Sequence, residues 1–273
     1  MTTWSDNVLG LIFQFYGLAF FSLCAVTFAL PKFYTVLKFA RHLNWLAGFG
    51  LLHGFFEFLC LQRLPESTSW LDISSIGLLI ASFIMLLEFG RRNWNTLTAS
   101  VRLGAAPLYS LLTVALILFV YPADEPLPKI ELGVHYLLGA PAAWLTAYVL
   151  LANDSGGPTI PSAVSHPACP CLKAAAAGFA VYGLLTLVPS LDHPFSTSGL
   201  PGAGDFYWLT GLPVQIPKAL SIIVIALSFV ALNRQAGILN QSNLFRVLNT
   251  LNGFVYRCRH DRQWSMVFIT EGV

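Results

Sequence analysis

Long apolar runs separated by short polar links make up most of the chain. A helix that crosses a bilayer needs about 20 mostly apolar residues, and seven stretches come close to that length. They are residues 8–30, 43–62, 70–90, 100–121, 131–152, 172–189 and 213–233. The pattern predicts an all-α integral membrane protein built as a seven-transmembrane helix bundle.

Composition and charge agree with this prediction. Of the 273 residues, 56% are hydrophobic and only 10% are charged, whereas about a quarter are charged in ordinary soluble domains. The net charge of +2 is small and no basic run is present, so we expect no nucleic-acid partner. The first seven residues carry no Lys or Arg, which argues against a cleaved secretory signal and for a retained first helix.

Basic residues gather in alternate links, which predicts the orientation. The links 31–42 and 91–99 and the tail after residue 233 are rich in Lys and Arg, whereas the links 63–69 and 122–130 are poor in them. Because cytoplasmic loops carry the excess of basic residues, we expect the N-terminus outside and the C-terminus in the cytoplasm. The longer link 153–171 is then a cytoplasmic loop, and 190–212 lies at the outer interface.

The composition becomes more polar after residue 233. Apolar positions in 234–251 are spaced as in an amphipathic connecting helix. In 252–273, the runs FVYRC and WSMVFI flank the polar RHDRQ, a pattern typical of a hairpin. A lone hairpin is marginally stable in water, so we expect a fragment cut inside its next domain. Residues 1–233 form the membrane domain in this division.

Ionisable side chains are rare inside the apolar runs, and at membrane depth they are functional hypotheses by default. His53 and Glu57 are spaced to share one helix face. At a rise of about 1.5 Å per residue, His53 lies roughly 13 Å deep, and Glu57, His135 and Lys218 lie roughly 6–8 Å below the outer surface. Three predicted helices thus bring ionisable groups to one level. We predict a polar pocket in the outer half of the bundle, with His53 as its floor.

Other side chains would complete such a pocket. Tyr136 and Gln215 could add hydrogen bonds at its rim. Phenylalanines near His53 and Glu57, with Trp144 deeper in the fifth run, would form aromatic walls.

Several occupants suit these groups. A b-type haem could take His53 and His135 as axial ligands of its iron, with Lys218 near a propionate. A quinone or a small carboxylic acid fits the same groups without a metal. In a purely structural alternative, Glu57 pairs with Lys218 or His135 to hold helices together, and His53 donates to a backbone carbonyl.

The remaining polar features suggest no catalysis. Glu88 lies beside two arginines at the cytoplasmic end of its run, where a helix-end ion pair is expected. Cys169, Cys171 and His166 match no strong zinc pattern, and the five cysteines show no disulfide framework. No nucleophile–base order, phosphate-binding loop or paired catalytic carboxylates are present. We therefore expect a chain without enzymatic activity of its own.

Four blocks of sequence resemble a known family. GFGLLHGFFEFL, LLEFGRR, YLLGAPAAWL and TGLPVQIPKAL look like a seven-helix sensory input domain of bacterial signalling proteins, over most of residues 8–240. The tail LNGFVYRCRHDRQWSMVFITEGV resembles the opening of a PAS domain. His53 and Glu57 match the HG-x-x-E block of the family, whereas His135 and Lys218 occupy positions where arginine is expected.

The resemblance implies a multi-pass protein of the bacterial inner membrane that acts as a homodimer. Its signal would pass to PAS domains and an output module of the same polypeptide, either a diguanylate cyclase or a histidine kinase. We therefore expect a sensory module that detects a ligand or redox change in the outer-half pocket. A membrane b-type cytochrome acting as electron carrier and a small-molecule transporter are the alternatives.

Overall fold

The computed structural model describes most of the chain and divides it into two compact units. The described residues are 6–30, 38–63, 69–98, 101–121, 126–154, 169–188, 203–249, 256–258 and 266–269. The first unit comprises Met1–Val230 and the second Ala231–Val273. Each unit is described by itself.

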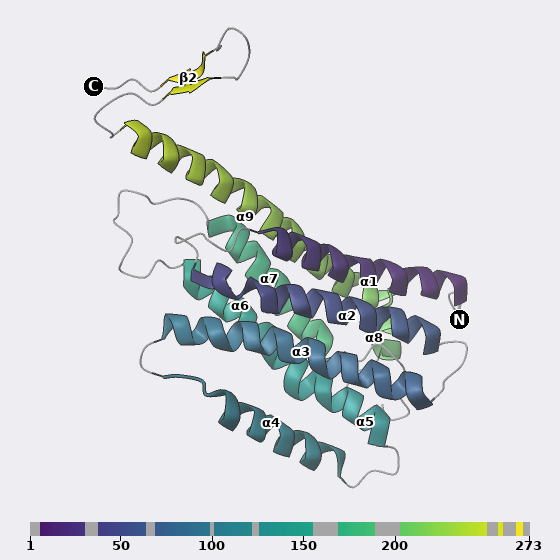
Figure 1. The fold of residues 1–273 in the computed structure, drawn as a ribbon. Helices are drawn as coiled ribbons and strands as arrows, with labels where there is room; N and C mark the ends of the chain where they lie inside the picture. Colours follow the sequence, from purple (N-terminus) through teal and green to yellow (C-terminus); the bar gives the residue numbers. More distant parts are fainter. Residues whose placement is uncertain are drawn as a thin grey trace. The chain divides into compact units, whose positions relative to one another are not determined.

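Helices make up the first unit, and each predicted apolar run coincides with one or more of them (Figure 1). Along the chain they are α1 (Asp6–Ala29), the 3-10 helix η1 (Lys38–His42), α2 (Leu43–Arg63), α3 (Ser69–Leu97), α4 (Ala105–Val120), α5 (Pro126–Gly133), the π-helix η2 (Val134–Gly139), α6 (Ala140–Asp154), α7 (Cys169–Thr186), α8 (Ala203–Thr210) and α9 (Gln215–Asn249).

Five of the described helical segments are long and apolar enough to cross a membrane. They are Gly10–Ala29, Phe39–Leu61, Trp70–Leu97, Pro126–Asn153 and Gln215–Gln235. Two further apolar helices, Ala105–Val120 and Pro170–Thr186, are shorter. The predicted all-helical fold of this region is confirmed, and the five long apolar helices are compatible with a membrane protein.

Some helix ends differ from the predicted ones. α3 continues to Leu97, past the predicted end at residue 90, because Arg91 pairs with Glu88 one turn earlier and this supports the helix. α7 begins at Cys169, inside the predicted loop, with Pro170 in its first turn, where proline is tolerated. The predicted outer link 190–212 contains the short helix α8.

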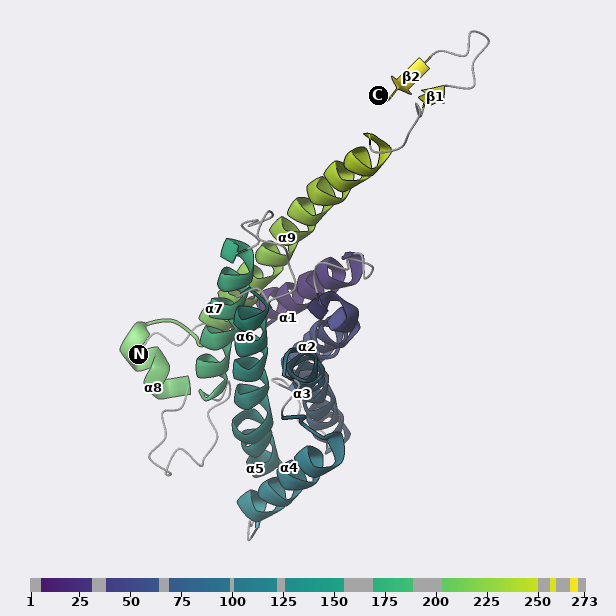
Figure 2. The same cartoon turned by 90° about the vertical axis from the view of Figure 1, so that its left-hand side faces the viewer.

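Neighbouring helices of the first unit pack in series. α1 packs on α2, α2 on α3, α3 on α6 and α6 on α7, as the two views of the ribbon show (Figures 1 and 2). A Cβ atom on Gly50 would lie 2.8 Å from the Phe20 carbonyl oxygen and 2.9 Å from the Cys24 backbone nitrogen. Glycine at this position lets the α1 and α2 backbones touch, as small residues do between membrane helices.

Large apolar side chains lie on the outside of the first unit as well as inside it. Among those that are more than half exposed are Phe15, Ile73, Leu118, Leu184 and Leu227, which come from α1, α3, α4, α7 and α9. Soluble monomers rarely expose large apolar patches. This surface suits contact with lipid on several sides of the bundle.

The C-terminal region contains one long helix and a strand pair. α9 runs without interruption from Gln215 to Asn249, so the predicted seventh span and the predicted connecting helix are parts of a single helix. Beyond it, β1 (Tyr256–Cys258) pairs antiparallel with β2 (Met266–Ile269). The predicted hairpin is therefore present in the second unit. A PAS identity for this region stays a prediction.

Candidate functional site

His53 lies at the centre of a buried polar cluster. Its Nδ1 is 2.9 Å from the Ser82 hydroxyl of α3, and its Nε2 is 3.2 Å from the Tyr182 hydroxyl of α7. Ser82 donates its own hydrogen to the Leu79 carbonyl at 2.8 Å, so towards His53 its oxygen accepts. His53 therefore carries a hydrogen on Nδ1, and in the neutral ring Nε2 accepts from Tyr182.

Aromatic rings enclose the His53 imidazole, as the sequence predicted for the phenylalanines. The centroid distances from the imidazole are 4.4 Å for Phe20, 5.3 Å for Phe49, 5.3 Å for Phe56 and 5.1 Å for Phe83. The prediction was wrong for Trp144, which is 40% exposed and donates to the Ala180 carbonyl on α7. It faces outward because it packs over Gly183, where the absence of a side chain leaves room for the indole.

Glu57 brings a carboxylate into the cluster from the next turn of α2. Its Oε1 is 3.5 Å from His53 Nε2. Its Oε2 is buried and has no hydrogen-bond partner within the described part of the chain. Lys218 of α9 is buried as well and acts on Glu57 electrostatically, while its Nζ donates to the Val188 carbonyl at 3.0 Å. An acidic and a basic side chain thus interact electrostatically inside the bundle.

His135 joins the cluster from η2. It is buried, and its ring lies 5.5 Å from the Phe83 ring, which also contacts His53. His135 and Lys218 both act electrostatically on His53. The structure therefore brings His53 together with Glu57, His135 and Lys218, the three residues that the sequence analysis placed at one level above it. His135 lies on a π-helical segment, a geometry often found at functional sites.

The two predicted rim residues lie in different surroundings. Gln215 is buried at the start of α9, three residues before Lys218 and thus on the same side of the helix. Tyr136 is half-buried, and its ring lies 6.4 Å from Phe119 of α4. Tyr136 is directed towards α4, since it follows His135 directly and the two side chains leave the helix in different directions.

Four residues of the cluster were missed by the sequence analysis. Ser82 and Tyr182 hold the two nitrogens of His53, and Tyr16 of α1 hydrogen-bonds to Tyr182. Glu131 of α5 is a second buried carboxylate that acts on Glu57. Glu131 was missed because it stands at the start of an apolar run, where a charged residue usually marks the membrane interface. Its position inside the predicted span 131–152 was the signal that could have identified it.

The packing around His53 does not fit an axial haem ligand. Both ring nitrogens already meet protein groups, and the Phe83 ring contacts His53 and His135 alike. A haem iron would require one His53 nitrogen to leave its partner and the surrounding rings to separate. Within the described residues, no group of three or more His, Cys, Asp or Glu side chains is placed to hold a metal ion. The haem hypothesis stays a prediction, and no step is derived from it.

A second ionic group lies at the other end of α3. Glu88 accepts from Arg91 and Arg92 at 2.6 Å each and from the Tyr109 hydroxyl of α4 at 2.9 Å. The predicted helix-end ion pair is confirmed, with a tyrosine from another helix added to it.

Comparison with known proteins gives no relative: no protein-family model matches the chain, and neither a curated protein nor a solved structure is detectably similar to it. The functional argument therefore depends on the residues of the chain itself.

Proposed function

We propose that the chain is a membrane-embedded sensory input module whose output element is α9. The observation that carries this proposal is the position of Lys218. It lies in the buried polar cluster, in the first turn of a helix that continues unbroken to Asn249. A change in the cluster therefore acts on a helix that extends into the second unit, where the β1–β2 pair follows.

The charges of the cluster supply the switching element. Lys218 interacts with Glu57 and with the Val188 carbonyl, and Glu57 has a buried oxygen without a hydrogen-bond partner in the described residues. A proton, or a small polar ligand that contacts this oxygen, changes how strongly Glu57 attracts Lys218. Such a signal shifts a two-state equilibrium only as far as it favours one packing of α9 over the other.

Seven crossings complete the proposed topology, with the N-terminus outside and the C-terminus cytoplasmic. The two shorter apolar helices, Ala105–Val120 and Pro170–Thr186, coincide with predicted spans. They extend about 24–26 Å at 1.5 Å per residue, slightly less than the roughly 30 Å of a bilayer core. Local thinning accommodates a mismatch of this size at modest cost. With seven crossings, the basic links all lie on one side.

The resemblance of the tail to a PAS opening completes the proposed role. The module then belongs to a bacterial inner-membrane receptor, working as a homodimer, with its output domain on the same polypeptide. The β1–β2 pair supports this assignment because it follows α9 at the place where the PAS-like sequence begins.

Hydrogen exchange tests whether the cluster controls α9. We expect Glu57→Gln to change the exchange of backbone amides in 237–249 by about tenfold, which corresponds to about 1.4 kcal/mol. The matched control is Glu88→Gln, which removes a carboxylate from the ion pair at the other end of α3 and should leave the amides of 237–249 unchanged. Equal exchange in Glu57→Gln and the unaltered chain would remove the basis of the sensory proposal.

A further inference from the structure

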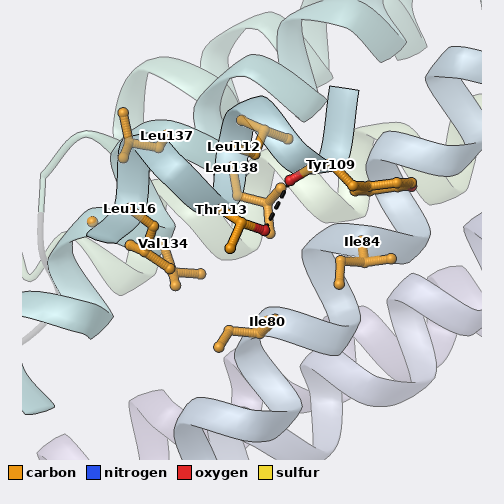
Figure 3. A pocket seen from close by; sticks show the side chains of 10 residues that line it. Ile80, Ile84, Tyr109, Leu112, Thr113, Leu116, Val134, Leu137 and Leu138 are labelled. Atoms are coloured by element: carbon orange, nitrogen blue, oxygen red, sulfur yellow. Dashed lines mark hydrogen bonds between the residues drawn. The ribbon is translucent and has the colours of Figure 1, made fainter. Parts of the chain in front are cut away.

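A crevice lies between α3, α4 and η2. Its volume is about 100 Å³, and Figure 3 shows side chains of α3, α4 and η2 around it. The lining comprises Ile80, Ile84, Tyr109, Leu112, Thr113, Leu116, Gly133, Val134, Leu137 and Leu138. α4 leans on α5 at Gly133, where a Cβ atom would lie 2.7 Å from Leu116 Cδ1.

The chemistry of this crevice suits a hydrocarbon. Its two hydroxyl groups are engaged, because Thr113 donates to the Tyr109 carbonyl at 2.8 Å and Tyr109 donates to Glu88 (Figure 3 shows the first bond). All other lining side chains are aliphatic apart from a glycine. No residue of α4 is buried, and Leu118 on its outer side is 70% exposed. The crevice thus opens within an apolar surface.

Positive charge lies at the end of the crevice that Tyr109 occupies. Tyr109 donates to Glu88, which also accepts from Arg91 and Arg92. The Arg92 side chain is 41% exposed, and its guanidinium lies 4.6 Å from the Trp45 ring of α2. One carboxylate is therefore shared by two arginines, of which Arg92 reaches the surface.

A third arginine, Arg102, lies in the segment before α4, which is bonded to the end of α3. Arg91 Nη1 donates to the Leu103 carbonyl at 2.8 Å, and the Leu103 amide donates to Asn95 Oδ1 at 2.7 Å. These bonds fix the segment before α4 against the end of α3. Arg102, which precedes Leu103, is exposed there. Glu88 balances only one of its two arginine partners, and Arg102 adds an exposed cation in the segment that Arg91 holds, so the excess charge at this end is positive.

From this combination we propose that an anionic phospholipid binds between α3 and α4. One acyl chain lies in the crevice, and the phosphate lies at Arg92 and Arg102. The volume of about 100 Å³ admits a segment of one chain, and the cationic end selects an anionic headgroup over a zwitterionic one. The proposal rests on the membrane location proposed above but is independent of the sensory role.

Native mass spectrometry of the detergent-purified chain tests the headgroup. The probes are phosphatidylglycerol and phosphatidylcholine with identical acyl chains. We expect phosphatidylglycerol to be retained in preference to phosphatidylcholine. Arg102→Gln should reduce this preference about fivefold, because that is the change in affinity expected when one arginine near an anionic headgroup is lost. Arg102→Lys should retain the preference, and Arg234→Gln, which changes an exposed arginine elsewhere, should leave it unaltered. Equal retention of the two lipids, or an equal loss in Arg234→Gln, overturns the proposal.

Filling the crevice tests the acyl chain. Ile84→Phe fills the crevice from α3, and Leu112→Phe fills it from α4. Two variants are used because a change in helix packing caused by one substitution alone would then not decide the result. We expect both to lose the retained phosphatidylglycerol. If both keep it, the lipid does not occupy the crevice and the proposal is wrong. Release of the chain from membranes by alkaline carbonate would instead refute the membrane location, so the two failures are distinguishable.

Discussion

Lys218 and Glu57 are ionisable side chains of opposite type inside a bundle whose interior is otherwise largely apolar. Desolvating each charge is expensive, and removing one partner leaves the other uncompensated. Ionic groups of this kind persist where the pair or its ligand has a use.

A double-mutant cycle measures the interaction between the two groups. We expect Glu57→Gln and Lys218→Met each to lower the free energy of unfolding by about 3 kcal/mol. The double variant should lose about 1–3 kcal/mol less than the sum, because the second change removes a charge that the first left unpaired. The measurement is unfolding in mixed detergent micelles.

Arg234→Met provides the control for this cycle. Arg234 is exposed on α9, so the loss of its charge should alter stability by no more than about 0.5 kcal/mol. Strict additivity of Glu57→Gln and Lys218→Met would show that the two groups do not interact.

At this scale the sequence predicted the ionisable members of the cluster better than the hydroxyl members. His53 and Glu57 are conspicuous because ionisable residues are few at membrane depth. Ser82 was not recognisable, because a serine in an apolar helix usually bonds back to its own backbone, as Ser221 and Ser228 do. Only the packing of α3 against α2 distinguishes Ser82, by placing its hydroxyl at His53 Nδ1.

Among the elements, α1 and α2 make the closest backbone contact described here. We expect Gly50→Ala to destabilise the protein by about 1–3 kcal/mol, because the new methyl group would meet the Phe20 carbonyl and the α1 backbone has to move away. Thermal unfolding in detergent checks this.

Gly77→Ala is the matched control within α3. Nothing lies within 4 Å of a Cβ atom at Gly77, so the higher helix propensity of alanine should stabilise by about 0.5–1 kcal/mol. If both variants shift the unfolding temperature in the same direction, the close approach at Gly50 is not limiting.

Helix existence was predictable and helix continuity was not. The break predicted near residue 233 relied on the change to polar composition, which marks where a helix leaves an apolar environment rather than where it ends. α9 accordingly passes through this point. The π-helix η2 had no sequence signal, because an i to i+5 turn depends on how Val134–Gly139 pack against neighbouring helices.

For the whole molecule, the proposed topology predicts which cysteines a membrane-impermeant maleimide can reach. In intact cells, with the other cysteines replaced, Ser67→Cys in the link 63–69 should be labelled and Cys258 should be labelled only after lysis. The reason is that basic links are retained in the cytoplasm. Labelling of Cys258 in intact cells would show that the proposed orientation is wrong and that the C-terminus lies outside.

In the proposed sensory role, the uninterrupted length of α9 would let it work as a lever. Its 35 residues extend about 50 Å at 1.5 Å per residue, well beyond the roughly 30 Å of a bilayer core. Pivoting by about 5° around Lys218 would carry Asn249 through roughly 4 Å, since about 46 Å of helix separates the two residues. A displacement too small to open the tightly packed rings around His53 is thus amplified at the far end of the helix into a distance comparable to the spacing between β-strands.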